Sequence, residues 1–158
     1  MIEFSEMYRK YATDVFRFAL YLSGNLGDAE DITSETFVRA VATSDRIEES
    51  TVKGYLLAIA RNLFLMGIRE RSRRSELDDG LRDGRPTAFD MVAQKAELTA
   101  VLDKLATLPA MDRAAVLLRT LDNRPYEEIA KILKISEVAA RVKVHRARTI
   151  LLAVKKGC

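Results

Sequence analysis

The chain has 158 residues, 48% of them hydrophobic, which is enough apolar material for one ordinary domain or two small ones, and no apolar run approaches the roughly 20 residues of a membrane span. One cysteine, Cys158, and one histidine exclude an internal disulfide and a metal cluster, and no Ser/His/Asp set or phosphate-cradling glycine loop supports catalysis, so we expect a binding protein without cofactor or metal. The net charge of +3 is uneven: it is 0 in residues 1–74, −3 in residues 75–94 and +6 in residues 95–158, so a polyanion such as DNA is expected to bind the C-terminal third.

Apolar residues at three-and-four spacing predict a first helix over residues 4–22, which Gly24 and Asn25 end. A second amphipathic helix follows, and Asp28 is well placed to be its N-cap. Further acidic residues then fall in the first turn of this helix, where negative charge is favourable against the helix dipole.

Residues 44–51 are polar and lack apolar periodicity, which predicts a loop. A third helix is predicted over residues 55–67, and it ends in a basic run, namely Arg69, Arg71, Arg73 and Arg74. In residues 75–94 the periodicity fails, and the Asp, Gly and Pro content predicts a flexible acidic linker. The sequence therefore predicts an all-α fold of two small helical domains, residues 1–74 and residues 95–158, joined by this linker.

Two further helical stripes, near Leu98 and Ala114, precede a segment typical of a helix-turn-helix. Residues 125–133 predict a short amphipathic helix, and after a tight turn Ser136 is a natural N-cap for a longer one. We therefore expect the second domain to be a helix-turn-helix domain. A helical wheel predicts the buried face of its last helix to be Ala140, Val144, Ala147, Leu151 and Val154.

The opposite face of this last helix has the pattern expected of a helix in a DNA major groove. A narrow outer strip is formed by Val138, Val142, His145 and Thr149. Basic residues flank the strip, with Arg141 and Arg148 on one side and Lys143 and Arg146 on the other. We assign phosphate contacts to these four basic residues and base contacts to the strip, together with Ser136 at the helix start. A merely solvated helix face is the alternative, although a pair of valines is unusual there and would also suit a protein partner.

Three segments, in this order and spacing, resemble the extracytoplasmic-function (ECF) group of bacterial RNA polymerase sigma factors over nearly the whole chain. The first is Asp28-Ala29-Glu30-Asp31-Ile32 with Glu35-Thr36-Phe37. The second is Tyr55-Leu56-Leu57-Ala58-Ile59-Ala60-Arg61-Asn62. The third runs from Tyr126-Glu127-Glu128-Ile129-Ala130 through Ile135-Ser136-Glu137 to His145-Arg146-Ala147-Arg148.

This resemblance implies a protein that binds core RNA polymerase and recognises promoter DNA. The second helix would dock on the clamp helices of the largest polymerase subunit through Asp31, Ser34, Glu35 and Phe37. Residues 44–51 and Tyr55 would capture unpaired bases of the −10 element. The backbone of that element would be held by Arg61, Asn62, Arg69, Arg71 and Arg73. The acidic linker would extend toward the RNA channel, and the C-terminal helix would bind the −35 element.

The chain departs from the usual pattern of the group at several positions. Tyr55 stands where tryptophan is usual, and it is either a DNA-stacking residue or a core aromatic. Ser34 replaces the usual glutamine of the polymerase-binding motif. Three residues of the last helix, Val138, Ala139 and Val142, replace the common glycine, threonine and serine. The three changes in the last helix predict an unusual −35 preference or a helix that contacts protein.

Two other functions are compatible with the sequence. One is a sigma-like decoy that binds an anti-sigma factor without supporting transcription, and the other is a conventional helix-turn-helix repressor. The repressor would leave the acidic second helix and the Arg61-Asn62 segment unexplained. For the sigma factor we expect an anti-sigma partner, because most members of the group are held inactive by one. We also expect a cytoplasmic location, because the N-terminus lacks a secretion signal, and a monomeric free state.

Overall fold

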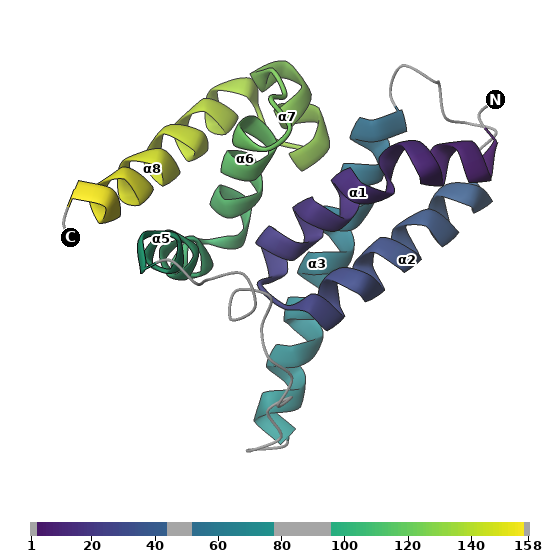
Figure 1. The fold of residues 1–158 in the computed structure, drawn as a ribbon, viewed down its shortest axis with the longest axis horizontal. Coiled ribbons are helices and arrows are strands. Elements are labelled where there is room, and N and C mark those ends of the chain that lie inside the picture. Colours follow the sequence, from purple (N-terminus) through teal and green to yellow (C-terminus); the bar gives the residue numbers. More distant parts are fainter. Residues whose placement is uncertain (1–2, 44–51, 78–95, 157–158) are drawn as a thin grey trace.

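The computed structural model describes residues 3–43, 52–77 and 96–156. Within these three ranges every regular element is an α-helix, so the expected all-α fold is confirmed (Figure 1). The helices are α1 (Phe4–Ser23), α2 (Leu26–Ala42), α3 (Val52–Leu77), α5 (Ala96–Thr107), α6 (Ala110–Thr120), α7 (Tyr126–Leu133) and α8 (Glu137–Lys156). None of the helices in these ranges is long and apolar enough to cross a membrane.

The α1–α2 corner is built from local signals. Gly24 ends α1 with a φ of 70°, a left-handed conformation that glycine adopts without strain, and its N–H bonds to the carbonyl of Leu20. Asn25 then caps α2, because its side-chain oxygen accepts the Asp28 N–H at 2.9 Å. The prediction that Asp28 is the N-cap is therefore wrong. Asp28 lies within the first turn instead, since the helix begins at Leu26.

Helices α1, α2 and α3 pack on one another and form the N-terminal unit (Figure 1). Met7 and Val15 of α1, Phe37 of α2 and Leu56 of α3 are almost completely buried in this unit. Helix α3 continues to Leu77, beyond the predicted end of the domain at residue 74. The rest of the predicted linker, residues 78–94, lies outside the described residues.

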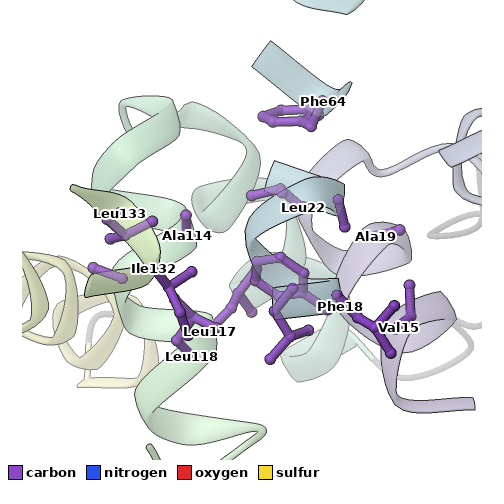
Figure 2. Packing of buried hydrophobic residues seen from close by; sticks show 14 of the residues in the cluster. Val15, Phe18, Ala19, Leu22, Phe64, Ala114, Leu117, Leu118, Ile132 and Leu133 are labelled. Carbon is purple, nitrogen blue, oxygen red and sulfur yellow. The ribbon is translucent and has the colours of Figure 1, made fainter. Parts of the chain in front are cut away.

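Helices α5–α8 form the C-terminal unit, and they pack against the N-terminal unit through a shared apolar core. Leu117 and Leu118 of α6 belong to the same buried cluster as Phe18 and Leu22 of α1 (Figure 2). Helix α6 contacts α1, and α7 contacts α3. Because apolar burial is the main favourable term in association, this core holds the two units together in a closed arrangement.

Polar contacts reinforce the closed arrangement at its edges. The Arg113 guanidinium of α6 donates to the carbonyl of Leu22 at the end of α1, and it lies 5.5 Å from the ring centre of Phe64 in α3. Lys53 of α3 forms ion pairs with Asp14 of α1 and with Asp122 beyond α6. These contacts join residues that are far apart in the sequence.

Candidate nucleic-acid interface

The predicted helix-turn-helix is formed by α7, a three-residue turn and α8. Lys134 ends α7 in the left-handed conformation, with a φ of 58°. The hydroxyl of Ser136 then accepts the Ala139 N–H at 3.0 Å, which confirms Ser136 as the N-cap of α8. The short turn therefore sets the angle at which α8 leaves α7.

The buried face of α8 is the one that its apolar spacing predicts. Ala140, Val144 and Ala147 are completely buried, and Leu151 is half-buried. The Val154 side chain lies outside the described part of the chain. With this face against α5, α6 and α7, the remaining surface of α8 points outward.

The outer strip of α8 is exposed along its whole length. Val138 is 71% exposed and Val142 is 52% exposed, and His145 and Thr149 are exposed as well. Two valines on the open face of one helix give an apolar contact surface between charged side chains. Such a surface can contact thymine methyl groups in a major groove or a protein partner.

The basic flank formed by Arg141 and Arg148 is also exposed. Arg141 forms an ion pair with Glu137 at 3.1 Å, and its guanidinium lies 4.5 Å from the ring centre of Tyr126. Arg148 has no ion pair among the described residues. An exposed pair such as Arg141–Glu137 contributes little stability, so both arginines remain available to phosphate.

The other basic flank, Lys143 and Arg146, is bound to a carboxylate that the sequence reasoning did not find. Asp112, in the first turn of α6, has a side chain only 2% exposed. It accepts two hydrogen bonds from Arg146, at 2.8 Å from Nε and 2.9 Å from Nη2, and Lys143 Nζ lies 3.5 Å away. The Arg146 hydrogen bond lowers the pKa of Asp112 despite its burial, so the carboxylate stays charged. No sequence signal links residues 31 and 34 positions apart in this way.

The residues predicted for the −10 element have unequal access to solvent. Tyr55 is partly exposed, and its hydroxyl bonds to the hydroxyl of Thr43 at 2.8 Å. Asn62 is half-buried. Arg61 is only 8% exposed and donates to the carbonyl of Ile132 in α7 at 3.3 Å, so this arrangement covers it, and its contact with the −10 backbone stays a prediction.

Three other predicted contacts to the −10 element fall on the C-terminal half of α3. Their side chains lie outside the described part of the chain, as does the whole of the predicted loop at residues 44–51; the three are Arg69, Arg71 and Arg73. A cleft of about 340 Å³ separates the start of α3 from α7. Its lining includes Tyr55 on one side and Lys131 and Glu127 on the other. Tyr55, one of the predicted −10 residues, therefore faces the helix-turn-helix across this cleft.

The predicted polymerase-binding residues on α2 divide into an exposed set and a buried one. Asp31, Ser34 and Glu35 are exposed, and Glu35 pairs with Arg39 at 3.2 Å. Phe37 is only 2% exposed, and its ring packs edge-on against Tyr8 at 4.9 Å between centres. Phe37 therefore packs in the core beneath the acidic face, and its part in polymerase binding stays a prediction.

An acidic cleft lies between α2 and α3. Its lining combines carboxylates and apolar groups, namely Asp28, Asp31, Ile32, Glu35, Leu63, Phe64, Gly67 and Glu70. Among the described residues no group of His, Cys, Asp or Glu side chains is arranged to hold a metal ion. The mixture of carboxylates and apolar groups in this lining has the chemistry of a protein contact, with charges that favour a basic partner.

Comparison with known proteins matches both units. Residues 7–74 match Sigma-70 region 2, and residues 98–151 match Sigma-70, region 4. The ECF RNA polymerase sigma factor SigM of Bacillus subtilis is 32% identical, over 94% of this chain and 93% of SigM. SigE of Mycolicibacterium smegmatis is 34% identical over 94% of this chain, which spans 60% of the length of SigE.

Solved structures match the complete arrangement of helices. The sigma factor RpoE of Bartonella quintana, in complex with the anti-sigma factor NepR, has a TM-score of 0.81 at 26% identity, over 97% of this chain and 96% of RpoE. CnrH, in complex with the cytosolic domain of CnrY, shares the fold, with a TM-score of 0.70 at 20% identity over 98% of this chain and 88% of CnrH. Both family matches and the SigM alignment cover the two units in the same order, and this chain belongs to the ECF RNA polymerase sigma factors.

Proposed function

We propose that the chain binds core RNA polymerase and directs it to specific promoters, and that it catalyses no reaction itself. The proposal assigns polymerase binding and the −10 element to residues 1–74 and the −35 element to residues 95–158. Residues 75–94 are the connector. Membership of the ECF sigma factors supports this assignment.

The observation that carries the proposal is the exposed face of α8. A capped helix at the end of a helix-turn-helix presents an open strip between basic residues on both sides. A major groove accepts one α-helix, with its floor of base edges between two phosphate backbones. The strip is therefore assigned to bases of the −35 element and the basic flanks to phosphates.

Exposed carboxylates on α2 support a contact with polymerase rather than with DNA. Asp31 and Glu35 face solvent in the lining of the acidic cleft, and their negative charges would be repelled by phosphate. The start of α3, with Tyr55, is assigned to the −10 element. Stacking and pocket contacts made only to unpaired bases would offset the few kcal/mol that unpairing each base costs.

Opening of the closed arrangement is part of the proposed cycle. Arg61 can hold a DNA backbone only after α7 moves away from α3, because the carbonyl of Ile132 now takes its guanidinium. The partner class proposed for the closed form is an anti-sigma factor, since the similar RpoE structure is a complex with one. The cycle is placed in the cytoplasm, where polymerase and promoter DNA are found.

Run-off transcription with purified core polymerase and a library of promoter fragments tests the proposal. The wild type is compared with Arg141→Ala plus Arg148→Ala, which removes two exposed charges from α8. We expect specific transcripts to fall by about tenfold or more, because each lost phosphate contact weakens binding. The matched control, Arg9→Ala plus Arg17→Ala, removes two exposed charges from α1 and should transcribe like the wild type.

The exposed valines of α8 favour one competing function, a decoy that binds an anti-sigma protein. If the wild type yields no specific transcript with core polymerase but binds such a protein tightly, the decoy replaces the sigma-factor proposal. Equal loss in the α8 and α1 variants would show that charge in general, and not the α8 surface, supports transcription.

A further inference from the structure

The carboxylate of Asp112 and the guanidinium of Arg146 join two helices across 34 positions of sequence. Both oxygens of Asp112 are used, one by Nε and one by Nη2 of Arg146. Asp112 is buried, whereas the Arg146 side chain is 53% exposed. The pair therefore has a fixed inner end on α6 and an open outer end on the DNA-facing side of α8.

Arg146 keeps donors for a second partner. A guanidinium has five N–H groups in a planar fork, and the paired edge uses two of them. The other three, on Nη1 and on the far side of Nη2, are left for a ligand beyond the carboxylate. Lys143 contributes a second cation at 3.5 Å, so the three side chains together carry a net positive charge.

We propose that Asp112 is a positioning residue for DNA binding: it holds Arg146 so that the free N–H groups of the guanidinium meet a backbone phosphate of the −35 duplex. This inference rests on the proposed function of α8. A free arginine side chain loses several rotatable bonds of freedom when it binds phosphate, and a guanidinium held in advance avoids much of that loss.

The other basic residues of the α8 surface have weaker support. Arg141 pairs with exposed Glu137 and lies 4.5 Å from the ring centre of half-buried Tyr126 in α7. Arg148 has no ion pair among the described residues. Within the described part of α8, a buried carboxylate partner on another helix is thus particular to the Lys143 and Arg146 flank. The held guanidinium sets the position of that flank relative to α6, and hence the register of α8 on the phosphate backbone.

The sign of one charge change tests the proposal. Asp112→Asn removes a negative charge from a DNA-binding unit, which by general electrostatics raises affinity for DNA. Loss of positioning has the opposite effect, and we expect the affinity to fall about tenfold, the size of one good phosphate or base contact. Asp103→Asn, on the exposed surface of α5, removes the same charge and should leave the affinity equal or slightly higher.

The measurement uses the full chain with core polymerase and labelled duplexes that the wild type selects from a random-sequence pool. Arg146→Lys keeps the charge but loses the two-pronged contact, and it should also bind about tenfold more weakly. In an Asp112→Asn background Arg146→Lys should add little further loss, because both changes remove the same arrangement. Thermal unfolding by circular dichroism checks that each variant is folded at the assay temperature.

The outcomes separate the two proposals. If Asp112→Asn binds as tightly as the wild type or more tightly, Asp112 only masks or stabilises the helix, and the positioning role is rejected. Additive losses of affinity in the double variant reject the positioning role as well. If Asp112→Asn fails to fold, Arg146→Lys alone still tests the proposal, because full affinity in Arg146→Lys also overturns it. If the wild type selects no duplex at all, the proposed function of α8 fails first.

Discussion

Single side chains decide where the helices of the DNA-binding unit begin. Ser136 satisfies an N–H in the first turn of α8 that has no partner within the helix. Ser136→Ala should lower the free energy of unfolding by about 1 kcal/mol, the usual cost of a lost N-cap. Urea denaturation of the full chain, followed by circular dichroism, measures this change.

Ser34 provides the matched control for Ser136. It is exposed in the middle of α2, and its side chain makes no hydrogen bond to a described residue. Ser34→Ala should change the free energy of unfolding by less than about 0.5 kcal/mol. Similar destabilisation by both substitutions would contradict the capping role of Ser136.

Asp112 makes the free energy of unfolding depend on pH in the acidic range. Its hydrogen bond to Arg146 lowers the pKa of the carboxyl below 3.8, the value of an unperturbed carboxyl, so the folded chain binds the proton less tightly than the unfolded chain. The stabilisation is complete above the unfolded pKa and is lost as the pH falls through the folded pKa. The stability advantage of the wild type over Asp112→Asn should therefore be constant near neutral pH and shrink below about pH 4. Urea denaturation across this range measures it, and a difference that does not change with pH would contradict the ion pair.

At the scale of the element, α8 combines a tightly packed inner face with an open basic outer face. Arg148→Ala should weaken binding to all duplexes and lower the slope of log affinity against log salt by about 1, because one counterion fewer is released. Salt titrations of duplex binding by the full chain measure the slope. Lys104→Ala, an exposed basic residue on α5, should leave the slope unchanged. Equal changes in the two variants would argue against α8 as the phosphate-binding helix.

At the scale of the whole molecule, the two units share one core and are joined by Arg113. Its guanidinium donates to the carbonyls of Leu22, Ala106 and Leu108, so Arg113→Ala leaves three acceptors without their charged donor. We expect the units to separate more often, which should raise the radius of gyration above the roughly 15 Å of a compact chain of this length. Small-angle X-ray scattering measures the change.

Arg9→Ala is the control for Arg113→Ala, because Arg9 is exposed on α1 and forms no ion pair with a described residue. It should keep the radius of gyration of the wild type. An unchanged radius in Arg113→Ala would show that the apolar contact of α6 with α1 holds the units together without this arginine. In the proposed cycle, opening is required because α7 covers Arg61 in the closed arrangement.

Much of the fold was predictable from the sequence because its signals are local. Apolar spacing identified α1 and the buried face of α8, and Gly24 and Ser136 marked helix ends, since these features involve residues within about four positions of one another. The exposed strip and basic flanks of α8 follow from the same periodicity. The motif segments, in their order along the chain, were enough to indicate the ECF sigma factors.

Only the tertiary structure decided which of the predicted site residues are exposed to solvent. Phe37 and Arg61 have the side chains expected of contact residues, but packing against Tyr8 and against α7 buries them. Asp112 and Arg146 are 34 positions apart, and Arg61 and Ile132 are 71 apart. Such contacts depend on how whole helices pack on one another, and the amino-acid sequence carries no periodic signal for this long-range packing. The sequence by itself determined the helices and the exposed basic side of α8, whereas the packing of the helices determined which charges on that side are paired.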